Sequence, residues 1–108
     1  MGMGTLTVQV HTGEDALPVA NAEVTVYAPD GRALYRALTD VSGNTIGFPL
    51  PAPDKRYTLD PTYLQPAYAV YDVVIRAAGY ATRHIHGVEI VDTQTTILPE
   101  NLSPLSDE

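Results

Sequence analysis

Apolar and polar residues alternate with a period of two along most of this chain. Leu6, Val8 and Val10 share one face of the first such segment, with polar residues between them, and the stretch 22–27 repeats the pattern. This alternation is typical of a strand with one buried face, whereas an amphipathic helix places its apolar residues about 3.6 positions apart. The chain is therefore predicted to be all β.

Turn residues separate the alternating segments. The run Pro29-Asp30-Gly31-Arg32 predicts a hairpin, because Pro presets φ and Gly tolerates a positive φ. Further strands are expected over residues 34–39, 46–50 and 70–78, then up to about residue 91, and at 95–98. Pro49 indicates that its strand lies at a sheet edge or ends there, since proline has no amide hydrogen to donate.

About seven short strands in 108 residues predict one β-sandwich domain. We expect the sandwich to span residues 5–99. Residues 1–4 are expected to be a leader outside the fold, and residues 100–108 an acidic, flexible tail or linker.

The chain is acidic, with six Lys and Arg against thirteen Asp and Glu and a formal net charge of -7. This charge repels phosphate backbones and anionic lipids, so we expect neither a nucleic acid nor a membrane surface as partner. No apolar run approaches the ~20 residues of a membrane helix, and the first residues carry no export signal. Because there is no Cys, stability is expected to rest on packing, and cysteine usage indicates no compartment.

Three motifs in order carry a resemblance to a known family. They are the stretch Pro18 to Val26, the turn Thr39-Asp40-Val41-Ser42-Gly43, and the strand Tyr71 to Ile75 followed by Ala78-Gly79-Tyr80. Over residues 5–99 the chain resembles the carboxypeptidase regulatory-like and collagen-adhesin B-type family. The resemblance implies a prealbumin-like sandwich, that is, an immunoglobulin-like Greek key of about seven strands.

A narrower likeness rests on the segments 50–53, 66–73 and 87–90. These segments resemble N-terminal domains of clostridial-type peptidoglycan-associated proteins. That likeness implies a non-catalytic accessory domain, for binding or spacing, in a bacterial cell-envelope, peptidoglycan or spore-associated protein. The implied partners are a neighbouring domain and peptidoglycan or another glycan or peptide, no cofactor is expected, and the implied location is extracellular, in the envelope or in the spore.

Prolines and tyrosines gather between residues 51 and 68, which predicts an extended loop. Tyr57, Tyr63 and Tyr68 are candidate ligand-binding residues, because tyrosines on a proline-stiffened segment can stack on sugar rings or a peptide. The alternative is that these tyrosines plug one open end of the sandwich. Tyr71 is expected to face the core.

His84 and His86 are candidate metal ligands, because residues two apart on a strand point to the same side. With Tyr71 or Tyr63 they are similar to the tyrosine and histidine iron ligands of intradiol dioxygenases. The alternative is that Gly87 allows a bulge, so that both imidazoles face solvent. His11 would be a third ligand only if the end of the first strand lay nearby.

Motifs of other catalytic classes are missing from the sequence. We find neither a Gly-X-Ser-X-Gly elbow nor a glycine-rich phosphate loop. We therefore expect the chain not to be an enzyme, with a metal-dependent enzyme built on His84 and His86 as one alternative. The other alternative is a protein-protein adaptor that uses an exposed sheet edge.

Overall fold

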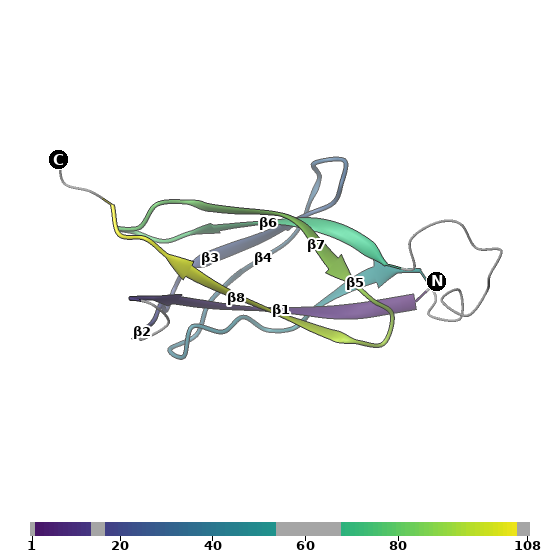
Figure 1. The fold of residues 1–108 in the computed structure, drawn as a ribbon, viewed down its shortest axis with the longest axis horizontal. Coiled ribbons are helices and arrows are strands. Elements are labelled where there is room, and N and C mark those ends of the chain that lie inside the picture. Colours follow the sequence, from purple (N-terminus) through teal and green to yellow (C-terminus); the bar gives the residue numbers. More distant parts are fainter. Residues whose placement is uncertain (1, 14–16, 54–67, 106–108) are drawn as a thin grey trace.

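The computed structural model describes residues 2–13, 17–53 and 68–105, which form two packed β-sheets (Figure 1). The strands are β1 (Gly2–Thr12), β2 (Leu17–Pro18), β3 (Glu23–Tyr27), β4 (Ala33–Leu38), β5 (Phe48–Ala52), β6 (Ala69–Arg76), β7 (Arg83–Ile90) and β8 (Thr95–Leu102). In this part of the chain no helix is long and apolar enough to cross a membrane. The all-β sandwich is confirmed, with the short β2 bringing the strands to eight.

The first sheet, which we call sheet A, is built around β1. β1 pairs antiparallel with β5 near its start and with β2 near its end. Its other side pairs with β8 in parallel, from the pair Thr5 and Thr95 to the pair Thr12 and Leu102. The first and last strands of the fold therefore lie side by side and run in the same direction.

The second sheet, sheet B, has the order β4-β3-β6-β7, and every neighbouring pair is antiparallel. The β3–β4 hairpin closes where the Ala28 amide donates to the Arg32 carbonyl at 2.8 Å. Gly31 in its turn has φ +89, a value that non-glycine residues rarely adopt. The hairpin predicted from Pro29-Asp30-Gly31-Arg32 is confirmed.

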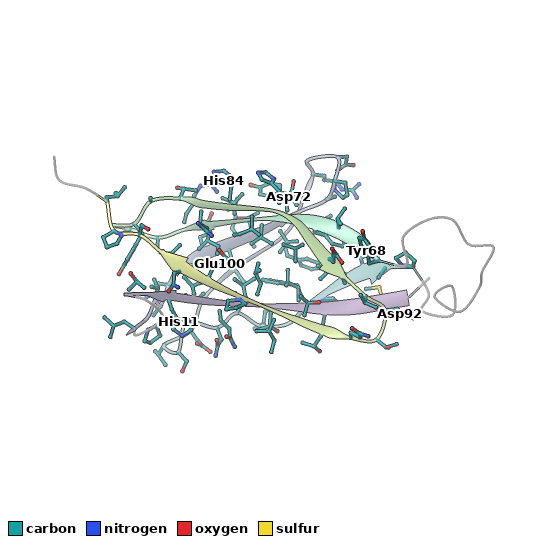
Figure 2. The ribbon with its side chains drawn as sticks, viewed as in Figure 1. His11, Tyr68, Asp72, His84, Asp92 and Glu100 are labelled. Carbon is teal, nitrogen blue, oxygen red and sulfur yellow. The ribbon has the colours of Figure 1, made fainter. Side chains whose placement is uncertain are left out.

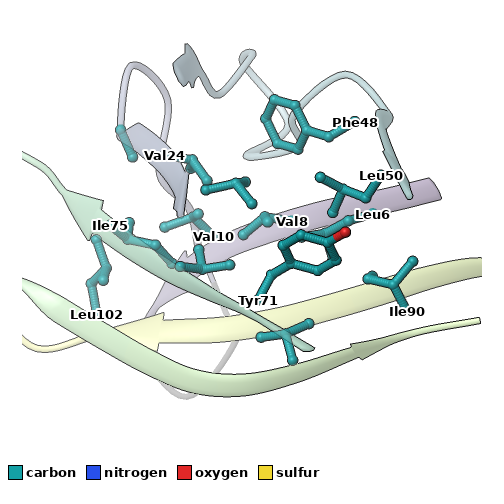
Figure 3. Close-up of a cluster of buried hydrophobic side chains, with 14 of the residues drawn as sticks. Leu6, Val8, Val10, Val24, Phe48, Leu50, Tyr71, Ile75, Ile90 and Leu102 are labelled. Carbon is teal, nitrogen blue, oxygen red and sulfur yellow. The ribbon is translucent and has the colours of Figure 1, made fainter. Parts of the chain in front are cut away.

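The core lies between the two sheets and consists of the apolar residues of the alternating segments (Figure 3). Leu6, Val8 and Val10 of β1 have no exposed surface. Neither do Val24 and Val26 of β3, which face them from sheet B. Burial of such a side chain stabilises the fold by about 1.5–3 kcal/mol, so the alternation of the sequence fixes which faces meet.

Residues 2–4 lie in β1, whereas the sequence predicts that residues 1–4 form a leader outside the fold; residue 1 lies outside the described residues. β1 begins at Gly2, and the Met3 amide donates to the buried carboxylate of Asp92 at 3.0 Å. A Cβ on Gly4 would lie 2.5 Å from the carbonyl oxygen of Val91. Gly2 and Gly4 let β1 approach residues 91 and 92 closely. Because glycine has no side chain, these residues show no alternation of apolar and polar positions, and the sequence therefore predicts that the strand begins later, at residue 5.

Two other boundaries differ from the prediction. β8 continues to Leu102, where the sequence indicated a linker after residue 99. β5 begins at Phe48, and the side chain of Ile46 is 72% exposed, although the alternation of residues 46–50 predicted that it faces inward. In both places tertiary contacts decide the strand limits, which local pattern does not encode.

Pro99 lies on the outer edge of sheet A, in β8. The Thr5 amide donates to the Gln94 carbonyl at 2.9 Å, so alternate residues of β8 bond to β1. Pro99 is one of the intervening residues of β8, which do not bond to β1, so its nitrogen faces away from β1.

The opposite edge of sheet A also carries prolines. In β5, Pro49 pairs with Thr5 and Pro51 with Met3. Thr5 and Met3 lie between the residues of β1 whose backbone groups bond to β5, so neither proline interrupts a bond of this ladder. Pro18 of β2 has the equivalent position opposite His11. All these nitrogens face away from β1, and the edge position predicted for Pro49 is confirmed.

Candidate functional site

A bulge in β7 places the two candidate metal ligands on the outer face of sheet B. Tyr71 pairs with Val88 and Val73 with Ile85, so that Asp72 lies opposite both His86 and Gly87. Gly87 has φ +74, and its amide donates to the Asp72 carboxylate at 3.2 Å. This is the bulge that the sequence allowed at Gly87.

Both imidazoles consequently face solvent. His84 and His86 are exposed, while Val88 and Ile90 beyond the bulge are buried. His86 Nδ1 lies 3.5 Å from the Asp72 carboxylate, and the two side chains are 77% and 42% exposed. A contact between such exposed groups contributes little to stability. The histidines have the outward orientation that a bulge at Gly87 was expected to give them.

The remaining proposed ligands lie elsewhere. His11 lies on β1 in sheet A, and Figure 2 shows it on the opposite side of the molecule from His84, so the condition under which His11 would be a third ligand is not met. Tyr71 is buried on the inner face of sheet B, away from the histidines, and Tyr63 lies outside the described residues. Among the described residues no three His, Cys, Asp or Glu side chains are grouped so as to hold a metal ion.

Of the three candidate ligand-binding tyrosines, only Tyr68 lies in the described part of the chain. It precedes β6 and is 37% exposed (Figure 2). Tyr57 and Tyr63 lie outside the described residues. Part of the Tyr68 ring is thus open to solvent at the start of a strand, where a ligand can stack on it.

Tyr71 is a core residue, as the alternation predicted. Its side chain is 6% exposed and lies among the core residues (Figure 3). Its hydroxyl donates to the carbonyl of Pro51 in the other sheet. Burial raises the pKa of Tyr71, and the neighbouring Tyr35 adds to this effect. The hydroxyl therefore stays protonated and links the two sheets.

A groove of about 600 Å³ opens beside the β3–β4 hairpin. It is lined by Ala28, Pro29, Asp30, Arg32, Leu34, Tyr35, Pro51 and Tyr71. Tyr35 of β4 also stacks on Phe48 of β5, with ring centroids 5.6 Å apart and planes 28° apart. This hairpin groove has the volume of a small-ligand site, with apolar walls and a few polar groups.

A smaller hollow of about 230 Å³ also borders β4. It is lined by Thr25, Ala33, Leu34, Tyr35 and Arg36. Thr25 points to the outer face of sheet B, and we call this space the outer hollow. The Thr25 hydroxyl is buried, and it finds no hydrogen-bond partner among the residues that the structure describes.

Sequence reasoning missed both hollows along β4. Arg32 was read only as part of a turn, and Tyr35 and Arg36 only as strand residues. The one available signal was the interruption of alternation after the hairpin, where β4 carries Leu34 as an extra residue opposite β3. Such a bulge changes the direction of the edge, but its position follows from pairing and not from composition.

The chain matches no protein-family model and no curated protein. Among solved structures it is similar to the TIE protein of Bacillus anthracis (TM-score 0.61, 19% identity, 94% of this chain covered). It is also similar to the minor pilin GBS52 of Streptococcus agalactiae (TM-score 0.59, 15% identity, 99% of this chain covered). A third similar structure is 3-chlorocatechol 1,2-dioxygenase of Rhodococcus opacus (TM-score 0.60, 12% identity, 96% of this chain covered).

The chain spans 16%, 47% and 61% of the lengths of these three proteins. The pilin and the TIE protein fit the prealbumin-like sandwich that the sequence motifs implied. A pilin and a dioxygenase share this architecture, so the fold alone assigns neither a structural nor a catalytic role. The chain is thus one sandwich of a fold that is also found in a minor pilin and in a dioxygenase.

Proposed function

We propose that this chain is a non-catalytic spacer domain of a bacterial cell-envelope protein, and that it also presents a binding surface. The observation that carries the proposal is the parallel pairing of β1 with β8. Because both strands run the same way, the chain enters the sandwich at one end and leaves it at the other (Figure 1).

The dimensions of the sandwich suit a domain joined in line with others. β1 has eleven residues, which at about 3.3 Å each span about 36 Å. The molecule measures 55 × 24 × 22 Å. A domain that is entered and left at opposite ends adds its long dimension to the protein that contains it.

The exit strand is fastened at several points. The Thr12 hydroxyl donates to the Leu102 carbonyl at 2.9 Å. Beyond β8, the Leu105 amide donates to the Gly79 carbonyl and the Ala81 amide to the Ser103 carbonyl, each at 2.9 Å. Tension between the ends of the chain pulls β1 and β8 in opposite directions along their axes, so the bonds of their ladder are loaded together and not one after another.

Single-molecule pulling tests this load-bearing geometry. The chain has no Cys, so handles attach only at introduced thiols. Handles at the two termini load the ladder in shear, whereas handles at the N-terminus and at Gln94→Cys open it from one end. We expect a clearly higher unfolding force in the first geometry, because forced unfolding follows the barrier on the pulling path. Equal forces would contradict the spacer proposal.

We further propose membership of the carboxypeptidase regulatory-like and collagen-adhesin B-type family and a place outside the cell or in its envelope. The support is the three ordered motifs together with the fold shared with a minor pilin. Protease treatment of intact cells of the source organism tests the location. Surface placement predicts loss of the protein from intact cells, and full protection until lysis would reject it.

The proposed binding surface includes Tyr68, with peptidoglycan fragments as its ligands. The support is the exposed ring of Tyr68 beside the proline-rich stretch. Titration with muropeptides, followed by NMR, is expected to shift the Tyr68 signals in the wild type but to leave the Tyr68→Ala variant without saturable binding. Chitin oligosaccharides serve as the control glycan. Unchanged signals at millimolar muropeptide would leave the spacer role alone.

A further inference from the structure

We propose that β4 accepts an extended segment of a partner protein as an added strand, with an acidic side chain of that segment placed beside Arg36 and Thr25. This inference does not rest on the spacer role. It concerns the edge of sheet B, whereas the spacer role rests on the terminal strands of sheet A.

The backbone of β4 presents free hydrogen-bonding groups along its outer edge. The Thr39 amide donates to the Ala22 carbonyl at 3.0 Å, which fixes the alternation of the β3–β4 ladder. It follows that the amides and carbonyls of Arg36 and Leu38 point away from β3. Within residues 2–13, 17–53 and 68–105, β4 pairs with β3 and with no other strand.

The other edges of the sandwich are protected. Both edges of sheet A carry prolines whose nitrogens face outward, as described above, and these block the addition of a strand. β7, the far edge of sheet B, is bulged at Gly87 and lies against β8. Arg83 Nε bonds Glu100 Oε1 at 2.7 Å, and the Thr96 hydroxyl donates to the Glu89 carbonyl at 3.3 Å. β4 is therefore the edge best suited to pairing.

Hollows lie on both sides of β4 at the place where an added strand would put its side chains. The hairpin groove and the outer hollow share Leu34 and Tyr35 of β4. Successive side chains of a strand point to opposite faces of its sheet. An added strand therefore directs one side chain to the groove and the next to the outer hollow, as in other cases of recognition by strand addition.

Thr25 gives the outer hollow a specific chemical requirement. Its side chain is 1% exposed, and its hydroxyl has no partner among the described residues. A buried hydroxyl without a partner costs free energy. The hydroxyl is covered, so an oxygen of a ligand in the hollow accepts its hydrogen bond only where the side chains that line the hollow, such as Arg36, move aside on binding.

The charges beside this hollow select an acidic group. The Glu23 carboxylate lies 3.8 Å from both Arg36 and Arg76, so one negative charge is shared by two positive ones. Arg36 is the one charged residue among those that line the hollow, and it is positive on a chain with a net charge of -7. A second copy of this chain is a poor occupant, because antiparallel self-pairing of β4 centred on Arg36 brings the two Arg36 side chains together, and both copies carry a net charge of -7.

The test uses a capped heptapeptide of alternating valine and glutamate, with a valine and lysine peptide of the same length as its counterpart. NMR titration and hydrogen exchange are expected to show protection of the Arg36 and Leu38 amides by the glutamate peptide. Arg36→Pro removes an outward donor without removing a bond to β3, and we expect at least about tenfold weaker binding. The matched control, His84→Pro, places a proline at an outward nitrogen of β7 and leaves binding unchanged.

Thr25→Val separates a binding role from a structural one. The variant is expected to bind the glutamate peptide more weakly and yet to unfold at a higher urea concentration, because an apolar isostere needs no partner. Equal binding by Arg36→Pro and the wild type would overturn the proposal, as would equal binding of the two peptides or none at millimolar concentration. A wild-type dimer that Arg36→Pro converts to a monomer would also overturn it, since the occupant is then a second copy.

Discussion

Sheets A and B face the same core but differ at their edges. Sheet A contains the first and last strands, and its edge strands carry Pro18, Pro49, Pro51 and Pro99 with outward nitrogens. Sheet B has no proline in its strands, and two hollows border its edge strand β4. Sheet A is thus built to hold the chain and to resist further pairing, whereas sheet B keeps one edge open.

The two sheets differ at their edges and not at their buried faces. Both inner faces consist of buried apolar side chains that belong to one core. Edges decide whether a sheet meets another chain, because unpaired backbone groups remain there.

Leu50 of sheet A and Leu38 of sheet B test the contrast between a filled core and an open edge. Leu50 has no exposed surface, whereas Leu38 is 60% exposed. Leu50→Ala is expected to lower the free energy of unfolding by about 2–5 kcal/mol through lost burial and a residual cavity. Leu38→Ala should change it by less than about 0.5 kcal/mol. Urea unfolding measures both, and similar losses would refute the contrast.

Gly43 and Gly31 lie in two turns that have similar φ values but different surroundings. Their φ values are +82 and +89, but a Cβ on Gly43 would lie 2.3 Å from the Val10 carbonyl oxygen, and one on Gly31 would meet nothing within 4 Å. Gly43→Ala is expected to cost about 2–4 kcal/mol from strain plus overpacking. Gly31→Ala should cost about 1–2 kcal/mol from strain alone. Thermal unfolding with equal losses would show that the close approach to β1 does not matter.

Tyr71→Phe tests the hydroxyl that joins the two sheets. Loss of its hydrogen bond to Pro51 is expected to cost about 0.5–1.5 kcal/mol near neutral pH. The pKa of Tyr71 is raised in the folded state, so above about pH 10 the unfolded chain releases this proton first and the stability of the wild type falls as pH rises. The variant should lack this component. Parallel slopes of wild type and variant in urea unfolding at alkaline pH would exclude it.

His84 and His86 provide the smallest expected effect. Because both side chains face solvent, His84→Ala and His86→Ala should each change stability by less than about 0.5 kcal/mol. Zinc or ferric iron is expected to leave the thermal midpoint of the metal-free wild type unchanged. A shift with either metal that the double variant abolishes would restore the alternative of a metal-dependent enzyme.

The sequence predicted only part of the candidate site. The sequence pointed to the histidine pair, to Gly87 as the residue that turns it outward, and to Tyr71 as core. It did not indicate that Tyr35 and Tyr71 line one groove, since these residues come from strands that neighbour each other only through β3. Nor did it show that the Thr25 hydroxyl lacks a partner, because hydrogen bonding of a buried group depends on every strand around it.

The alternation and the turn residues of the amino-acid sequence are enough to predict the β class, the inner faces of the strands and the hairpin at Gly31. These features follow from side-chain alternation and turn chemistry, which act between near neighbours in the chain. Only the tertiary structure decided that Gly2 to Gly4 belong to β1, that β8 lies parallel to β1, and that β4 is an edge without prolines. Pairing between distant strands is set by how the whole core closes, and no local pattern contains that information.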